Sequence, residues 1–159
     1  EDSRVAGFNL FLGPMRMEIR EAQIGGWNQF KCGDWVLDPK IAKPSYTRSL
    51  RIAKGVLITT NHSFDVCATI SIGENTWIGG SHSQFWTHGA GVVGDIEIGA
   101  NCYVGSAVRF SSGSGLGNNV LLALGSVVTK RLTEENALVG GVPAKVLKQN
   151  WHWKEQAGK

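Results

Sequence analysis

Apolar residues recur at every sixth position over much of the second half of the chain. Six of them follow one another without a gap: Ile98, Val104, Phe110, Leu116, Leu122 and Val128. This spacing matches neither the 3.6-residue period of an α-helix nor the two-residue alternation of a half-buried strand. It predicts a coil with three flat faces, in which each face turns one apolar side chain inward. Stacked coils of this kind pair their strands in parallel and bury a continuous apolar column.

The same period extends toward the N-terminus with interruptions. It predicts five coils, over residues 24–36, 46–58, 72–84, 98–110 and 116–128. The steps from 46 to 72 and from 72 to 98 are both 26 residues long. These two consecutive coils are therefore each expected to contain an excursion, that is, an extruded loop, at the same position of the coil. An antiparallel β-sandwich also has regularly spaced strands, but it does not explain a strict spacing of six.

We therefore expect an all-β fold in one domain over residues 1–159. Its β-helix coils occupy residues 24–130, and a C-terminal cap follows at 131–159. Residues 143–156 are predicted to form a helix within this cap, with Pro143 in its first turn.

Composition narrows the function classes. The net charge of +3 is only mildly basic and no run of Lys or Arg is present, which argues against nucleic-acid binding. No apolar run approaches the roughly 18 residues that span a bilayer. Cys32, Cys67 and Cys102 are odd in number, far apart and without zinc-type spacing. They predict reduced, buried thiols and a cytoplasmic protein.

Four segments resemble the hexapeptide-repeat acyltransferases, a family with a left-handed parallel β-helix, and among them the maltose- and galactoside-type sugar O-acetyltransferases. These segments are ISIGENTWIGG (70–80), IEIGANCYVGS (96–106), LGNNVLLALGSVVTK (116–130) and ALVGGVPAKVLK (137–148). The resemblance implies acetyl transfer from acetyl-CoA to a hydroxyl or amine of a sugar or polysaccharide precursor. It also implies a homotrimer with active sites between subunits. Val142 and Leu124 depart from the family pattern, which often has Asn and a small residue there.

Two histidines are candidates for the base that removes the acceptor proton. His62 and His88 lie 26 residues apart, the local coil length, so we expect them side by side on one edge of the prism. TTNHSFD (59–65) resembles a Thr-His-Pro-Leu-Asp stretch of the sugar O-acetyltransferases, which implies His62 as the base and Asp65 as the residue that orients it. FWTHGAG (85–91) is similar to the His-centred loop of serine acetyltransferases, so His88 either shares this role or binds the acceptor. A purely structural role stays open for both.

The resemblance also implies a donor site. Small residues would line the coenzyme groove, Trp77 would lie near the thioester, and polar or basic residues would approach the nucleotide. The groove and nucleotide residues are Gly80, Gly105, Ser106, Ala123, Gly125, Thr129, Lys130 and Lys145.

The acceptor site rests on fewer residues. Asn28 lies roughly where sugar-acetylating relatives place an acceptor-binding Asn. Four aromatic residues either stack on a sugar or contact a neighbouring subunit: Trp27, Trp35, Phe85 and Trp86.

Two other functions stay open. The γ-class carbonic anhydrases share this β-helix and bind zinc through three histidines. Residues 62, 82 and 88 do not reproduce their spacing, so no metal is expected. A non-catalytic β-helix that binds a partner is the other alternative.

Overall fold

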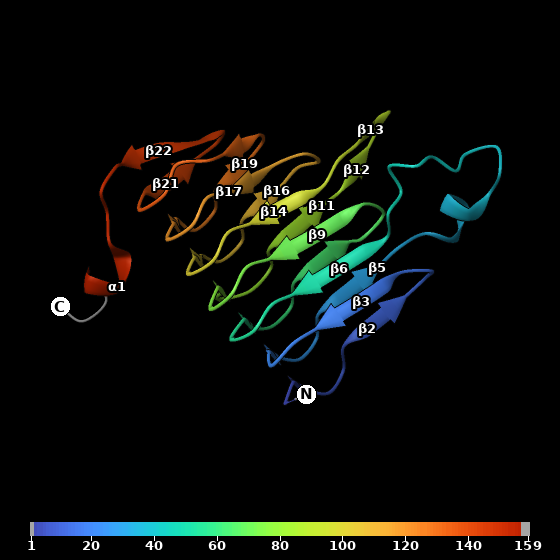
Figure 1. Cartoon of the computed structure of the whole chain (residues 1–159), viewed down its shortest axis with the longest axis horizontal. Coiled ribbons are helices and arrows are strands. Elements are labelled where there is room, and N and C mark those ends of the chain that lie inside the picture. The colour runs from blue at the N-terminus through green and yellow to red at the C-terminus, as the bar shows by residue number, and fades with distance from the viewer. Residues whose placement is uncertain (1, 157–159) are drawn as a thin grey trace.

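Three parallel sheets form the sides of a triangular prism in the computed structural model, which describes residues 2–156 (Figure 1). The chain passes through the first, second and third sheet in turn, and each passage adds one strand to each sheet. We call the edge between the first and second sheets the first corner, and the edge between the second and third sheets the second corner.

The strands of each sheet are short. The first sheet holds β1 (Arg4–Val5), β4 (Gln23–Ile24), β7 (Leu57–Ile58), β10 (Trp77–Ile78), β15 (Tyr103–Val104), β18 (Leu121–Leu122) and β21 (Leu138–Gly141). The second holds β2 (Leu10–Leu12), β5 (Gln29–Lys31), β8 (Ser63–Asp65), β11 (Gln84–Trp86), β16 (Arg109–Phe110) and β19 (Val127–Val128). The third holds β3 (Arg16–Ile19), β6 (Ser49–Ile52), β9 (Thr69–Ile72), β14 (Ile96–Ile98), β17 (Gly115–Leu116) and β20 (Arg131–Leu132).

The residues of the six-residue repeat form the buried core that the sequence predicted. The six residues of the gap-free series are all buried, with at most 5% of their surface exposed. Phenylalanines stack inside the second sheet, and their ring centroids lie 5.0, 4.7, 4.4 and 5.1 Å apart in the order Phe11, Phe30, Phe64, Phe85, Phe110. Phe85 therefore takes the inward position that the strict repeat gave to Gln84, because the corner before β11 holds one residue more.

Two segments of the described chain leave the prism, both at the second corner. Residues 32–48 separate β5 from β6 and contain the 3₁₀ helix η1 (Asp34–Leu37). Residues 87–95 form the antiparallel hairpin of β12 (His88–Gly89) and β13 (Val92–Val93). Only residues 66–68 connect β8 to β9. The excursions thus belong to alternate coils and not, as predicted, to consecutive ones, so Val36 and Tyr46 lie in a loop and not in a coil.

Both ends of the prism differ in detail from the prediction. Strands β1 to β3 add a coil before residue 24. At the other end, β22 (Ala144–Lys148) runs antiparallel to β21, so the predicted helix is present only as α1 (Trp153–Gln156). Trp153 packs against the outer side of the first sheet, with its ring centroid 5.7 Å from that of Tyr103, and its Nε1–H donates to the Asn101 carbonyl at 2.8 Å.

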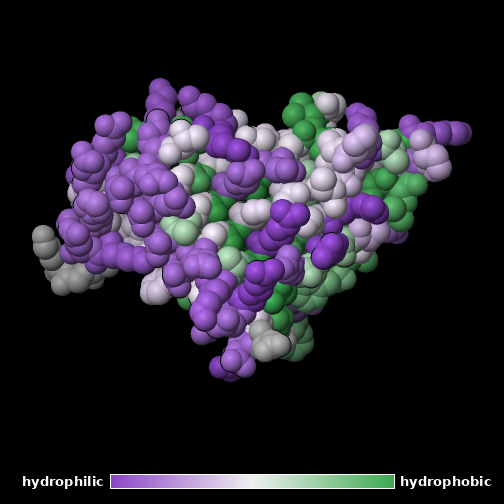
Figure 2. Space-filling model, viewed as in Figure 1, coloured by the Kyte–Doolittle hydropathy of each residue, from purple (hydrophilic) through white to green (hydrophobic). Residues whose placement is uncertain are grey.

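The surface is polar over much of the face shown in Figure 2, and apolar side chains gather near η1 and the N-terminal coil. Phe8 is 78% exposed there and Leu12 is 56% exposed. Among the described residues, no helix has the length and apolar character to cross a bilayer.

Candidate active site

His62 and His88 lie at opposite ends of the second sheet. Ser63 pairs with Gln84 and Asp65 pairs with Trp86 in the parallel register of β8 and β11. His62 precedes β8 and so lies at the first corner, whereas His88 follows β11 and lies at the second. The predicted side-by-side arrangement is therefore wrong. The 26-residue spacing of the two histidines suggested equivalent positions in neighbouring coils. It does not correspond to equivalent positions, because a tight turn joins β8 to β9 whereas a hairpin follows β11.

His62 is a buried, fully bonded residue of the first corner. Its side chain is only 1% exposed; Nδ1 accepts the Ser83 backbone N–H at 3.2 Å and Nε2 lies 3.0 Å from Thr59 Oγ1. Burial, and secondly the nearby His82, lower the pKa of His62 to about 4. The ring thus stays neutral at physiological pH with both nitrogens occupied. This geometry corrects the prediction that Asp65 orients His62.

Asp65 instead binds His88. Its Oδ2 lies 2.7 Å from His88 Nδ1, and it also accepts the backbone N–H groups of Thr87 and His88, at 3.1 and 3.2 Å. The Asp65 side chain is 12% exposed and that of His88 is 30% exposed. A carboxylate that accepts the Nδ1–H leaves Nε2 with a free lone pair, so the ring is oriented to take a proton.

Thr87 fixes the position of Asp65. The buried Thr87 Oγ1 accepts the backbone N–H groups of Cys67 and Ala68, at 3.0 and 2.9 Å. It lies 2.7 Å from the carbonyl oxygen of Asp65 and 3.0 Å from its Oδ2. The tight turn after β8 is in this way tied to the start of the hairpin. The pair of Asp65 and His88, called the dyad below, is therefore held in place by the backbone of two neighbouring coils.

Aromatic residues surround this corner. Trp35, from η1, lies with its ring centroid 5.1 Å from the His88 ring, and Tyr46 meets Trp35 edge-on at 5.4 Å. Trp86 faces outward beside Asp65 and is 42% exposed. The loop at residues 32–48 thus reaches past the coil of β7, β8 and β9 and contacts the hairpin at residues 87–95. This contact is possible because the intervening turn is short.

Two predicted acceptor residues have other surroundings. Asn28 is buried; its Nδ2 donates to the Gly25 and Thr59 carbonyls and its Oδ1 accepts the His62 backbone N–H. Phe85 belongs to the phenylalanine stack. Neither side chain is available to a sugar. Trp27 stacks on Phe8 with a centroid distance of 4.6 Å, at the N-terminal end of the prism.

The predicted small residues of the coenzyme groove line the first corner of three successive coils: Gly80, Gly105, Ser106, Ala123 and Gly125. Gly80 has a φ of +66°, and a Cβ there would overlap Ser106 Oγ. A Cβ on Gly105 would lie 2.8 Å from the Leu124 nitrogen. The lack of a side chain at Gly80 and Gly105 therefore lets neighbouring coils approach closely along this corner, whereas Leu124 in the same corner is 78% exposed.

The remaining predicted donor residues lie elsewhere. Thr129 and Lys130 connect β19 to β20, at the second corner, on the same edge as His88. Lys145 pairs with Gly140 in the terminal hairpin. Trp77 faces outward on β10, with its ring 6.3 Å from that of Trp153. The predicted donor residues are thus spread over both corners of the second sheet, the outer face of the first sheet and the terminal hairpin.

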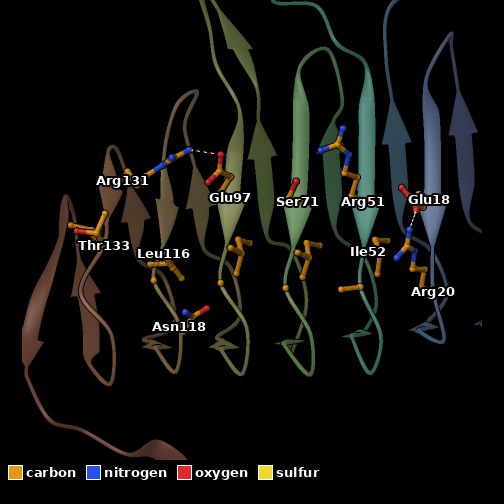
Figure 3. Close-up of a pocket in the computed structure, with 17 residues that line it drawn as sticks. Glu18, Arg20, Arg51, Ile52, Ser71, Glu97, Leu116, Asn118, Arg131 and Thr133 are labelled. Carbon is orange, nitrogen blue, oxygen red and sulfur yellow. Dashed lines mark hydrogen bonds and ion pairs between the residues drawn. The ribbon is translucent and has the colours of Figure 1, made fainter.

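A groove of about 790 Å³ lies on the outer side of the third sheet (Figure 3). Figure 3 shows the ion pair between Glu97 and Arg131, at 2.8 Å, and the pair between Glu18 and Arg20 along this groove. None of the predicted site residues lines it. The groove is therefore separate from the Asp65–His88 pair.

Sequence reasoning missed several members of the site. Thr87 carries only the weak signal that it precedes His88. Tyr46 was assigned to a coil, and Cys67, whose Sγ lies 3.4 Å from Asp65 Oδ1, was treated only as a buried thiol. His82 is exposed with a φ of +62° and lies on the first corner. The three histidines of the zinc alternative thus do not converge, since His88 lies on the other edge.

Comparisons with known proteins agree with this architecture. No family model matches the chain. It is 27% identical over 115 residues to the galactoside O-acetyltransferase of Escherichia coli (strain K12), covering 66% of this chain and 56% of that protein. A hexapeptide-repeat containing acetyltransferase from Vibrio cholerae has a TM-score of 0.60 at 27% identity, with 63% of this chain and 62% of that chain covered. Its complex with acetyl coenzyme A has a TM-score of 0.55 at 22% identity, covering 92% and 70%.

One relative is a galactoside O-acetyltransferase and the other a hexapeptide-repeat containing acetyltransferase, so the resemblance inferred from the sequence is confirmed, as is the left-handed parallel β-helix. The chain spans little more than half the length of the galactoside O-acetyltransferase that it matches.

Proposed function

We propose that the protein transfers an acetyl group from acetyl-CoA to a hydroxyl or amine of a sugar or polysaccharide precursor, with His88 as the general base. The observation that supports this most is the 2.7 Å contact between Asp65 Oδ2 and Nδ1 of a partly exposed His88. The galactoside O-acetyltransferase relative favours a sugar acceptor, and the acetyl coenzyme A complex of the Vibrio cholerae protein favours this donor.

The chemistry assigned to the pair is a proton transfer. The acceptor must lose a proton as it attacks the acetyl carbonyl, and His88 Nε2 takes that proton. The Asp65 carboxylate stabilises the imidazolium that results, without becoming protonated itself. The imidazolium then returns the proton to the departing thiolate of the donor. His88 thus ends each cycle in its starting form.

A homotrimer brings the divided donor residues together. The strip of small residues at Gly80 and Gly105 and the His88 edge lie on opposite sides of the second sheet, so one prism does not place them on one corner. In a ring of three copies, the second corner of one subunit meets the first corner of the next. Lys130 and His88 would then face the neighbour's strip. Lysine charges suit the phosphates of the donor.

The acceptor is proposed to bind between the aromatic residues of the second corner. Trp35 and Trp86 offer apolar faces beside the dyad, and a sugar ring presents apolar faces of its own. For the compartment we propose the cytoplasm, because Cys32, Cys67 and Cys102 are free thiols, which a reducing environment preserves.

A screen of sugar acceptors with acetyl-CoA, read by release of free thiol, tests the reaction. We expect His88→Ala to lower turnover by about 10²- to 10⁴-fold. His62→Ala should retain turnover of wild-type order at a temperature where it is folded. Wild-type turnover in His88→Ala, or no donor binding by the wild-type protein, overturns the proposal.

Mixed trimers test the shared site. Subunits with His88→Ala are co-expressed with subunits in which Ser106→Trp fills the first corner. Because each variant keeps one intact corner, mixed trimers should regain part of the wild-type activity. Activity no higher than that of the separate variants contradicts a site between subunits.

A further inference from the structure

The turn after β8 brings three kinds of metal-binding atom together. Among the described residues, Asp65, Cys67 and His88 offer a carboxylate oxygen, a sulfur and an imidazole nitrogen that all lie within 4.8 Å of one another. Cys67 is fully buried, whereas the side chains of Asp65 and His88 are 12% and 30% exposed. Solvent therefore reaches the cluster through the imidazole and the carboxylate.

The two carboxylate oxygens of Asp65 have different surroundings. Oδ2 is held by the backbone N–H groups of Thr87 and His88, at 3.1 and 3.2 Å. Oδ1 has the Cys67 thiol as its neighbour, with Sγ at 3.4 Å. A cation that replaces the proton of the Cys67 thiol would therefore contact Asp65 Oδ1. The backbone N–H groups would continue to donate to Asp65 Oδ2. The carboxylate is in this way already oriented for a metal ion.

The ligand types select a class of cation. A thiolate, an imidazole and a carboxylate together suit Zn²⁺ and similar borderline-soft divalent ions, and they do not suit Mg²⁺ or Ca²⁺. One thiolate and one carboxylate balance the charge of a divalent ion. Burial, and then the negative charge of Asp65, raise the pKa of Cys67, so the thiol keeps its proton until a cation displaces it.

We propose that Asp65 Oδ1, Cys67 Sγ and His88 Nδ1 bind one Zn²⁺-like ion, with solvent in the fourth position, and that this ion switches the base off. Binding releases one proton, from the Cys67 thiol. The proton on His88 Nδ1 moves to Nε2 through solvent, so Nε2 has no lone pair for the acceptor proton. The inhibition rests on the proposed function, whereas the binding site does not.

Cobalt provides a readout that is independent of activity. Co²⁺ titrated into the purified full chain should bind one equivalent and give a thiolate-to-metal charge-transfer band in the near ultraviolet. Cys67→Ser should lack this band and bind at least about tenfold more weakly. Cys102→Ser is the matched control, because this buried cysteine lies at another corner with its Sγ 3.1 Å from the Gly117 carbonyl oxygen. Equal binding by the wild type and Cys67→Ser, or an equal loss in Cys102→Ser, overturns the site.

Turnover with and without Zn²⁺ tests the consequence. Zn²⁺ should inhibit the wild type, and a chelator should restore it. Turnover of Cys67→Ser, expressed relative to its own rate without metal, should not fall when Zn²⁺ is added. If Co²⁺ binds as expected but Zn²⁺ leaves turnover unchanged, the metal site stands and the switch is wrong. The turnover of His88→Ala, measured separately, then decides whether the assignment of His88 as the base also fails.

Discussion

Asp65 and His88 meet across two neighbouring coils, with Asp65 Oδ2 at 2.7 Å from His88 Nδ1. Asp65 ends β8 and His88 follows β11, the next strand of the second sheet, so the parallel register itself brings them together. The same carboxylate oxygen accepts two backbone N–H groups of the hairpin. The imidazole is thus oriented by a group whose own position the fold determines, which is the arrangement that a general base requires.

Replacing Asp65 by Asn tests the orienting role. We expect turnover to fall by about 10²- to 10⁴-fold, because an amide donates to Nδ1 as readily as it accepts and so favours the wrong tautomer. The measurement is steady-state thiol release at saturating donor. Ser63→Ala is the control, since Ser63 also faces outward on β8 but two residues earlier. A fall of similar size in Ser63→Ala, or none in Asp65→Asn, contradicts this role.

The buried His62 should make stability depend on pH. Its pKa of about 4 in the folded protein lies below the usual value of 6.5, so the unfolded chain binds the proton more readily. The contribution is fully present above pH 6.5 and is lost as the pH falls toward 4. It amounts to about 3 kcal/mol. Urea unfolding between pH 4 and 7.5 measures the slope, which His62→Asn should reduce. An NMR titration of the His62 ring with a midpoint near 6.5 contradicts the prediction.

The strict six-residue period predicted the core only where each step is six residues long. From Ile98 to Val128 the chain has no insertion, and every predicted residue is buried. Between Ile78 and Phe85 the step is seven, so counting in sixes arrived at Gln84 and missed the stacked ring. One additional residue in a corner changes neither the composition nor the visible motif. It only shifts every later position by one.

The dyad was beyond the reach of spacing alone. Asp65 and His88 were both named from the sequence, but Asp65 was assigned to His62, three residues away in the chain. The actual partner depends on which coil lacks an excursion, and the turn after β8 is short while the segments at 32–48 and 87–95 are long. The short turn after β8 and the position of the Trp35 loop are both determined by how the coils stack. Neither can be recognised from the nearby sequence alone.

Trp35 should affect the acceptor more than the chemical step. Its ring lies 5.1 Å from that of His88 without a hydrogen bond to the dyad among the described contacts, so Trp35→Ala removes a binding surface and leaves Asp65 and His88 in place. We expect the acceptor KM to rise about tenfold, with kcat and the donor KM little changed. Trp27→Ala is the matched control, because that exposed ring stacks on Phe8 away from His88. A loss confined to kcat contradicts the assignment.

The phenylalanine stack should carry much of the stability of the coils. Phe64 is fully buried between Phe30 and Phe85, so Phe64→Ala leaves a cavity that rigid parallel strands on all sides prevent from closing. We expect the free energy of unfolding to fall by about 3–5 kcal/mol. Phe11 ends the same stack and is 43% exposed, so Phe11→Ala should cost less than about half as much. Urea unfolding of both variants measures the difference. Equal losses would show that the end of the prism is covered by something that makes Phe11 a core residue.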